Sequence, residues 1–304
     1  MHTGWPILSS REIRAARPTK SPVDSQRPYA FLVEPECSPE GRIENVATIF
    51  LTNRECPFTC LMCDLWKNTL DEPVAVGDIP RQIDFALDRL PAAEHIKLYN
   101  SGNFFDPHAI PVEDYSEIAA RLPGFRTVIV ENHPRLCGDD CLRFRDAIDG
   151  TLEVALGLET THPEVLRRLN KQMTLDDFQR AAAFLLRENI QLRTFILLRP
   201  PFLSEAEGID WAMHSIDYAF SLGIRCCSVV PSRAGNGIME HLQTGGQFAP
   251  PELRSMEAVL ERGIRLGRGR VFMDLWDAAQ FSKCDRCGPA RVERMRQMNL
   301  TQQV

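Results

Sequence analysis

The sequence from Val46 to Cys63 reads Val-Ala-Thr-Ile-Phe-Leu-Thr-Asn-Arg-Glu-Cys-Pro-Phe-Thr-Cys-Leu-Met-Cys. It starts as a β-rich apolar run and ends in three cysteines, Cys56, Cys60 and Cys63. Three thiolates this close together can wrap one compact metal centre, and iron–sulfur clusters are normally held by cysteine thiolates, four when coordination is complete. Because only three cysteines are local here, a four-iron cluster would keep one iron open for a small molecule.

Beyond the cysteines, short β-rich runs alternate with amphipathic stretches of helical period. We expect strands near 46–52, 95–99, 127–131, 152–159, 191–198 and 225–230, and helices near 80–90, 112–122, 140–148, 163–169, 175–188, 205–222 and 251–266. These six βα units are fewer than the eight that close a full barrel. The pattern therefore predicts the α/β class and an open, partial (β/α)6 TIM-like barrel, with its active site at the carboxyl ends of the strands.

The two ends of the chain lack this alternation. Residues 1–43 carry several prolines, from Pro18 to Pro39, among scattered charges, and we expect an extended N-terminal arm with little chemistry. Residues 44–266 are the predicted core. Residues 267–304 are predicted to be a short C-terminal extension.

Composition narrows the classes of function. The formal net charge of −6 disfavours indiscriminate nucleic-acid binding through a broad basic surface, although a local basic patch is compatible with it. No apolar run reaches the length of a membrane span and the N-terminus lacks a secretory signal, so we expect a cytoplasmic protein with no membrane partner. In that reducing compartment, the ten cysteines are better explained as metal ligands than as disulfides.

The CxxxCxxC loop after the first strand of a six-unit partial barrel resembles the radical S-adenosylmethionine (radical SAM) superfamily. The resemblance implies a [4Fe–4S] cluster on Cys56, Cys60 and Cys63 whose open iron binds S-adenosylmethionine. It also implies an electron donor such as flavodoxin or ferredoxin, and reductive cleavage of the cofactor to a 5′-deoxyadenosyl radical that abstracts a substrate hydrogen. The family often has an aromatic residue before the third cysteine, where this chain has Met62; Phe58 or Trp66 could cover the adenine instead. The alternative interpretations of the triad are a zinc site, with Asp64 or a distant cysteine as the fourth ligand, and plain loop cysteines.

The resemblance also implies cofactor contacts at the other strand ends, where a barrel gathers its site. Lys171 follows an asparagine where related enzymes carry an arginine that pairs with the cofactor's carboxylate, and a lysine lacks the bidentate fork. For each position a tight turn, a helix cap or a solvated side chain is the alternative. The candidate cofactor-binding residues are Ser101, Gly102 and Asn103 after the second strand, Glu131 after the third, Glu159 after the fourth, and Lys171 beyond it.

Two other features lie outside this core pattern. Arg199 and Arg233 follow the fifth and sixth strands and are candidates for an anionic part of the substrate. Cys284 and Cys287 have the spacing of half a metal site, which would need two more ligands. A zinc ion or an auxiliary cluster there, or simply two reduced thiols, are the interpretations left open.

Within the superfamily, Leu-Tyr-Asn-Ser-Gly after strand two, Gly-Leu-Glu-Thr after strand four and Leu-Asn-Lys beyond it resemble the branch of the Elongator catalytic subunit and the archaeosine synthase radical subunit. That resemblance covers the core only and implies tRNA modification. Three hypotheses remain: a radical SAM enzyme acting on a tRNA base or nucleoside, one acting on a small metabolite or peptide, and a non-catalytic iron–sulfur or zinc-binding redox protein. The core motifs alone leave the substrate open.

Overall fold

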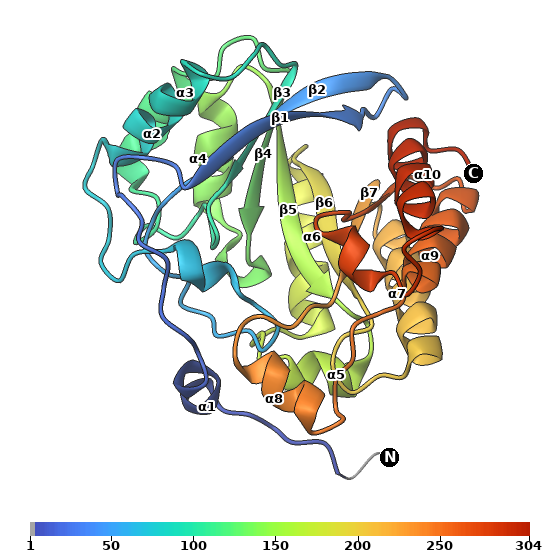
Figure 1. The fold of residues 1–304 in the computed structure, drawn as a ribbon. Helices are drawn as coiled ribbons and strands as arrows, with labels where there is room; N and C mark the ends of the chain where they lie inside the picture. Colours follow the sequence, from blue (N-terminus) through green and yellow to red (C-terminus); the bar gives the residue numbers. More distant parts are fainter. Residues whose placement is uncertain (1–3) are drawn as a thin grey trace.

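A computed structural model describes residues 4–304 of the chain. One curved sheet holds eight strands in the order in which they occur in the sequence, and all of them are parallel except the first (Figure 1). The strands are β1 (Ala30–Cys37), β2 (Ile43–Phe50), β3 (His95–Tyr99), β4 (Thr127–Asn132), β5 (Thr151–Glu159), β6 (Gln191–Leu198), β7 (Cys226–Pro231) and β8 (Arg270–Met273).

Helices connect the parallel strands and cover the outer face of the sheet. Several begin with a side-chain cap; in α6 and α7, a Thr or Ser and an acidic residue three positions later form a capping box. The α-helices are α1 (Ser10–Ala15), α2 (Asp78–Leu87), α3 (Tyr115–Ala119), α4 (Asp139–Ala147), α5 (Pro163–Arg168), α6 (Leu175–Arg187), α7 (Glu205–Ser221), α8 (Ile238–Thr244), α9 (Leu253–Arg265) and α10 (Gly288–Thr301). Short 3-10 turns are η1 (Leu65–Asn68), η2 (Val112–Asp114), η3 (Pro134–Leu136) and η4 (Ala278–Phe281).

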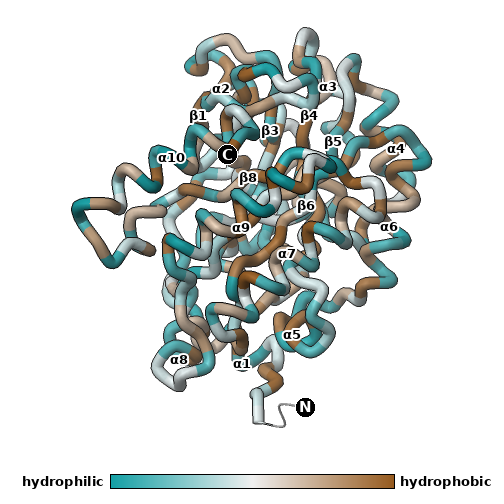
Figure 2. Tube along the Cα trace, turned by 90° about the vertical axis from the view of Figure 1, so that its right-hand side faces the viewer, coloured by the Kyte–Doolittle hydropathy of each residue, from teal (hydrophilic) through white to brown (hydrophobic). Residues whose placement is uncertain are grey.

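The main apolar core lies between the sheet and the helices. Alternate strand residues such as Ile96, Leu98 and Val130 are fully buried there. Hydrophobic segments follow the strands, while hydrophilic segments lie on outer helices such as α4 (Figure 2). Within residues 4–304, no helix has both the length and the apolar character needed to cross a membrane.

The open partial barrel predicted from the sequence is confirmed, and the sheet has one further strand at each edge, β1 and β8. The six predicted strands correspond to β2 through β7. β8 extends the sheet within the predicted C-terminal extension, and its four residues are too short to give a periodic signal.

The expectation of an irregular N-terminal arm was wrong in part, because β1 and α1 lie within it. β1 pairs with β2 at the edge of the sheet, where Pro35 is tolerated because an edge strand leaves one side without ladder partners. α1 begins with a capping box from Ser9 and Glu12.

A second apolar cluster lies at the end of the barrel toward which the parallel strands point. It joins Ile13 of α1, Leu61 of the cysteine loop, Leu169 after α5 and Met239 of α8. α1 and α8 lie side by side there (Figure 1). A Cβ on Gly237 would lie 1.9 Å from the Ala16 carbonyl oxygen, so only glycine allows this close approach of the arm. Helices distant in sequence thus support the loop that carries the three cysteines.

Candidate active site

The cysteine loop leaves the carboxyl end of β2 and is closed at its base. The Leu70 amide donates to the Asn53 carbonyl at 2.8 Å, and the Glu55 amide donates to the Leu70 carbonyl at 2.9 Å. The three thiols, Cys56, Cys60 and Cys63, are free and partly exposed within this closed loop. The structure therefore places the predicted cluster ligands at the end of the barrel where the sequence predicted them.

Asparagine side chains fix the backbone of the loop from two directions. The Asn170 amide donates to the Thr59 carbonyl at 2.7 Å. The Asn236 amide donates to the carbonyls of Leu61 at 2.8 Å and Cys63 at 3.1 Å. Neither asparagine was predicted as a site residue; Asn170 lies beside Lys171 in a recognised motif, whereas nothing in the local sequence marks Asn236.

The thiols are suited to bind iron once they lose their protons. Burial raises the pKa of the Cys56 thiol to about 11 and the pKa values of Cys60 and Cys63 to about 12. Asn103 Nδ2 donates to Cys56 Sγ at 3.1 Å, which stabilises a thiolate there. Since thiolates are the metal-binding form, loading this loop releases protons.

A tight turn after β3 is held by the carboxylate at the end of β4. Glu131 Oε1 accepts a hydrogen bond from the backbone amide of Asn100 at 2.7 Å and one from the backbone amide of Gly102 at 3.4 Å. Burial raises the pKa of Glu131, and these backbone donors partly oppose that rise. Ser101 Oγ lies 2.7 Å from the hydroxyl of Tyr29, which precedes β1. The predicted residues Ser101, Gly102 and Glu131 thus form one unit, with a partner from the N-terminal arm.

Glu159 and Lys171 form a buried ion pair, with Lys171 Nζ 2.7 Å from Glu159 Oε1. Burial opposes the charge on Lys171, but the neighbouring Glu159 carboxylate outweighs it, so the pKa of Lys171 is raised. A β-bulge separates Gly157 from Glu159, and Glu159 has a φ of 65°. Non-glycine residues in this region are strained and gather at functional sites.

Gly157 is essential to that pair. A Cβ at this position would lie 2.2 Å from Glu159 Oε1 and 2.5 Å from Lys171 Nζ. The two side chains therefore lie directly over the strand and inside the barrel. The structure brings together two residues that are 12 positions apart in the sequence and that were predicted separately.

The two aromatic side chains suggested for the adenine are engaged within the protein. Phe58 stacks on His133 with the ring centroids 3.7 Å apart. Trp66 is 4% exposed, and the Arg17 guanidinium lies 4.6 Å from its ring centroid. Met62 packs against the second apolar cluster. Covering the adenine with the buried Trp66 ring would require its packing to change, whereas Phe58 is half-buried.

Burial lowers the pKa of His133 to about 3, so its ring is neutral. His133 Nδ1 accepts from the Arg135 amide at 3.2 Å, and its Nε2 lies 2.9 Å from the Lys171 carbonyl oxygen. The proton must then be on Nε2, which donates to that carbonyl. His133 thereby joins the cysteine loop, through Phe58, to the segment carrying Lys171.

Buried polar atoms without partners gather at the same end of the barrel. Both polar atoms of the Asn100 side chain lack a hydrogen-bond partner among residues 4–304, although Asn100 is fully buried. Because buried polar atoms are normally paired, such a group marks a place for water or a ligand. Side chains with at least one such atom at this end include Thr52, Asn53, Thr59, Asn100 and Ser232. This donor set, beside three free thiols, fits a polar cofactor held next to an iron–sulfur cluster.

The two arginines suggested for the substrate have acidic partners. Arg199 lies 2.5 Å from Glu205, and Arg233 lies 2.7 Å from Asp274. Binding of a substrate anion at either arginine would therefore compete with an existing ion pair. Their role as substrate contacts stays a prediction.

Cys284 and Cys287 lie together on the exposed segment before α10, where the Cys287 amide is 3.4 Å from Cys284 Sγ. In the part of the chain that the structure describes, no group of three His, Cys, Asp or Glu side chains is gathered as a single metal ion requires, and this holds for Cys56, Cys60 and Cys63 as well as for the Cys284–Cys287 pair. A second metal site at this pair stays a prediction.

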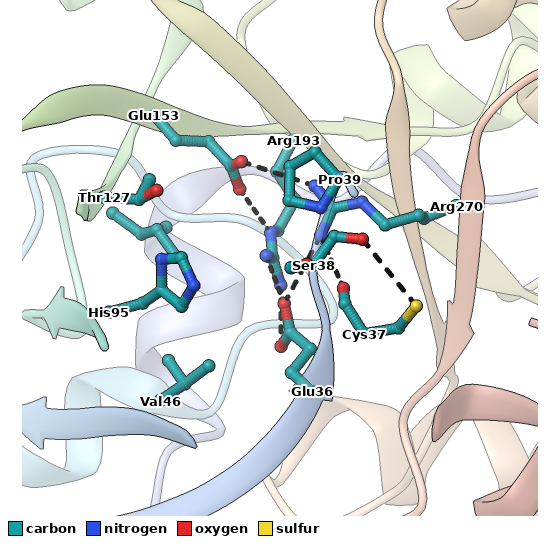
Figure 3. A pocket seen from close by; sticks show the side chains of 11 residues that line it. Glu36, Cys37, Ser38, Pro39, Val46, His95, Thr127, Glu153, Arg193 and Arg270 are labelled. Carbon is teal, nitrogen blue, oxygen red and sulfur yellow. Dashed lines mark hydrogen bonds and ion pairs between the residues drawn. The ribbon is translucent and has the colours of Figure 1, made fainter. Parts of the chain in front are cut away.

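The cavities lie at the opposite end of the barrel. One of about 20 Å³ is lined by Glu36, Arg193 and Glu153, with the Arg193 guanidinium between the two carboxylates (Figure 3). A larger one of about 650 Å³ adjoins it and includes Arg225 and Arg268. Neither of these two cavities includes a cysteine of the triad.

Sequence comparison finds archaeal relatives for most of the chain. An uncharacterized protein of Methanocaldococcus jannaschii is 24% identical over 92% of this chain and 83% of its own length. Archaeosine synthase subunit beta of Methanosarcina acetivorans is 27% identical over 67% of this chain. The matched region spans 61% of that subunit and 57% of its counterpart from Thermococcus kodakarensis. No protein-family model matches the chain.

Solved structures share the fold. Methylornithine synthase PylB superposes with a TM-score of 0.56 at 14% identity, covering 81% of this chain and 69% of that chain. Elp3 of Methanocaldococcus infernus superposes with a TM-score of 0.54 at 14% identity, covering 72% and 59%. SuiB of Streptococcus suis, solved with S-adenosylmethionine bound, gives 0.51 at 13% identity and covers 73% and 48%. These comparisons agree with the barrel that the strand pattern predicts.

Proposed function

We propose that this chain, a member of the radical S-adenosylmethionine superfamily, is an enzyme that modifies a base of tRNA. The superfamily and the enzyme class are those that the cysteine loop predicts. The observation that carries the proposal is the position of Cys56, Cys60 and Cys63 on the closed loop after β2, at the end of the barrel that also holds buried polar atoms without a partner among residues 4–304. The tRNA substrate is supported by the names of the archaeosine synthase relatives.

Cys56, Cys60 and Cys63 are the residues that would hold the [4Fe–4S] cluster of this superfamily. When bound, the cluster and S-adenosylmethionine supply a radical that abstracts hydrogen from the substrate. The chain's own part is to orient the loop: Asn170 and Asn236 hold its carbonyls, and Asn103 donates to Cys56. These contacts leave the three thiols available for iron.

The Glu159–Lys171 pair is the proposed contact for the amino-acid part of S-adenosylmethionine. A carboxylate and an ammonium held together offer one charge for the ligand's ammonium and one for its carboxylate. Because both side chains are buried, such contacts are stronger than they would be in water. The turn at Ser101 and Gly102, which Glu131 holds through the backbone amides of Asn100 and Gly102, lies in the same ring of strand ends.

The first experiment tests the cluster and the cleavage together. The purified protein is reconstituted anaerobically, its iron and sulfide are counted, and 5′-deoxyadenosine is measured after dithionite and S-adenosylmethionine are added. Single replacements Cys56→Ala, Cys60→Ala and Cys63→Ala should each abolish cluster and 5′-deoxyadenosine. Cys227→Ala is the matched control, since Cys227 is fully buried in β7 within the main core. Cleavage retained in any triad variant would refute the assignment.

The second experiment addresses the substrate. Deuterium transfer from deuterated tRNA into 5′-deoxyadenosine would identify tRNA as the source of the abstracted hydrogen. Cleavage without transfer from any tRNA pool would favour a small metabolite or a peptide. An intact cluster without cleavage would favour a non-catalytic redox protein. Flavodoxin or ferredoxin is the proposed physiological reductant, and the same assay with either in place of dithionite tests it.

A further inference from the structure

Trp276 is an exposed aromatic side chain at the carboxyl end of β8. Its relative exposure is 62%, and it is the one aromatic among the strongly exposed large hydrophobic residues within 4–304. β8 runs parallel to β7 and, through the intervening strands, to β2. Trp276, which comes after β8, and the cysteine loop, which comes after β2, therefore lie at the same end of the barrel. An indole in this position gives up the favourable free energy of burial unless something covers it.

The backbone of Trp276 is held firmly although its ring is exposed. The Trp276 amide donates to Asp274 Oδ1 at 2.8 Å, and its carbonyl accepts from Arg233 Nη2 at 2.6 Å. The same Arg233 nitrogen lies 2.7 Å from Asp274 Oδ2. The Asp274 amide in turn donates to the Val229 carbonyl at 2.8 Å and continues the β7–β8 ladder. The backbone that carries the indole is therefore held by hydrogen bonds at the end of the sheet.

Residues 233–236 connect the backbone of Trp276 to the cysteine loop. Arg233 supports Trp276, and three residues later Asn236 donates to the carbonyls of Leu61 and Cys63. Between them, the Gly235 carbonyl accepts from Lys67 of η1. The position of the indole is thus fixed relative to the thiols through contacts on both sides of the segment.

We propose that Trp276 is a stacking platform for an unpaired nucleobase of the RNA substrate. This inference rests on the proposed function and names a residue that positions its substrate. A single planar ring with charged neighbours, such as Asp277 and Arg233, fits stacking on one base better than a protein interface, which needs a broad apolar patch. Arg286 is exposed farther along the same segment and can meet an adjoining phosphate, whereas Lys283, also exposed, already pairs with Glu252 at 2.6 Å.

The test compares three variants of the reconstituted holoenzyme for binding of unfractionated tRNA. Trp276→Ala removes the ring, and Trp276→Phe keeps a smaller stacking surface. Ile43→Ala is the control, because Ile43 is 55% exposed at the opposite, amino end of β2. We expect Trp276→Ala to weaken tRNA binding roughly five- to hundredfold, as removal of a stacked aromatic does. Trp276→Phe should restore most of the affinity, and Ile43→Ala should match the wild type.

Formation of 5′-deoxyadenosine without RNA separates this proposal from the function on which it rests. It should be equal in all three variants and the wild type. If neither the wild type nor any variant cleaves S-adenosylmethionine, the proposed function is wrong, whether or not the protein binds tRNA. If cleavage is intact but Trp276→Ala binds tRNA as the wild type does, or the wild type binds none, the platform is wrong. A wild-type dimer that Trp276→Ala converts to a monomer with unchanged tRNA binding would also overturn it, and would make Trp276 a self-association contact.

Discussion

Both ends of the barrel bury charged side chains, but the two ends satisfy them differently. At the amino end, Glu36 accepts from Lys97 at 2.5 Å and from Arg193 at 2.5 Å, and Arg193 also lies 2.7 Å from Glu153. At the carboxyl end, the Glu159–Lys171 pair lies near the thiols of Cys56 and Cys60, and buried polar atoms such as those of the Asn100 side chain have no partner within residues 4–304. The charged side chains at the amino end are thus paired with one another, whereas the carboxyl end also holds buried polar atoms without a partner among residues 4–304.

Strained backbone occurs at both ends of the barrel: at the amino end, Asn189 before β6 and Gln302 after α10 have φ values of 58° and 51°. At the carboxyl end, positive φ values occur at Glu159, which ends β5, and at Ser101, Asn170 and Arg199, which come after β3, α5 and β6. Such conformations persist only where the surrounding structure holds them. The two ends therefore differ in how their buried polar groups are partnered, and not in backbone strain.

The largest effect on stability is expected from Arg193→Met at the amino end. Removing this guanidinium leaves Glu36 and Glu153 buried without their main partner, and breaking a buried ion pair costs about 3–5 kcal/mol. Urea unfolding followed by circular dichroism measures the loss. Arg143→Met is the matched control, since the Arg143–Asp140 pair is on the surface and should contribute ~0–1 kcal/mol. Equal stability of the two variants would show that the amino-end network is not structural.

The next effect, on activity, is expected from Gly157→Ala at the carboxyl end. The new methyl group would displace Glu159 Oε1 and Lys171 Nζ from over the strand. Losing charge-assisted contacts to the cofactor should reduce 5′-deoxyadenosine formation about ten- to hundredfold. Gly138→Ala controls for glycine replacement, because a Cβ there meets nothing within 4 Å. Unchanged cleavage of S-adenosylmethionine by Gly157→Ala would show that the Glu159–Lys171 pair does not bind the cofactor.

A smaller and more selective effect is expected from Gly102→Ala. The nearest atom to a Cβ there, the Asn100 carbonyl oxygen, is 3.6 Å away, so the folded chain accepts the methyl group. The unfolding free energy should stay within about 0.5 kcal/mol of the wild type. If the cofactor approaches this backbone, its affinity should fall about tenfold, as an extra methyl group in a tight contact causes. Equilibrium dialysis with S-adenosylmethionine gives the affinity, and an unchanged value would leave the turn without a cofactor role.

The carboxyl end was more predictable from sequence than the amino end. Cys56, Cys60 and Cys63 form a local pattern, and Glu131 and Glu159 are polar residues that end apolar strands. Strand alternation alone therefore places them at one edge of a parallel sheet. The partner of Glu36 lies 157 residues away in the sequence, at Arg193. No local pattern encodes a contact over that separation.

Other residues were missed for similar reasons. β1 contains Pro35, which locally argues against a strand and is acceptable only because β1 is at the edge of the sheet. Tyr29 and Ser10 reach the site from the arm expected to have little chemistry. Asn236 lies in a loop without motif, and its importance comes from the two carbonyls that the folded chain brings to it.

The last comparison takes one carboxylate from each end and follows how its contribution to stability depends on pH. Burial opposes ionisation of Glu36, but Arg193 and Lys97 outweigh it and lower its pKa below the ordinary 4.5. The unfolded chain then binds the extra proton, so the contribution of Glu36 is present above about pH 4.5 and is lost as the pH falls. Burial raises the pKa of Glu131 instead. Its contribution is present below its unfolded pKa and is lost as the pH rises through the folded value.

Glu36→Gln and Glu131→Gln should therefore change the stability profile in opposite directions. Glu36→Gln should flatten the loss of stability between pH 5 and pH 3, by on the order of 1 kcal/mol for each unit of lost pKa difference. Glu131→Gln keeps a carbonyl oxygen for the Asn100 amide, so relative to the wild type it should gain stability as the pH rises above 4.5. Urea unfolding of the metal-free proteins across pH 3–7 measures both. Parallel profiles would mean that the two ends hold their carboxylates in equivalent environments, contrary to the difference in partners that distinguishes them.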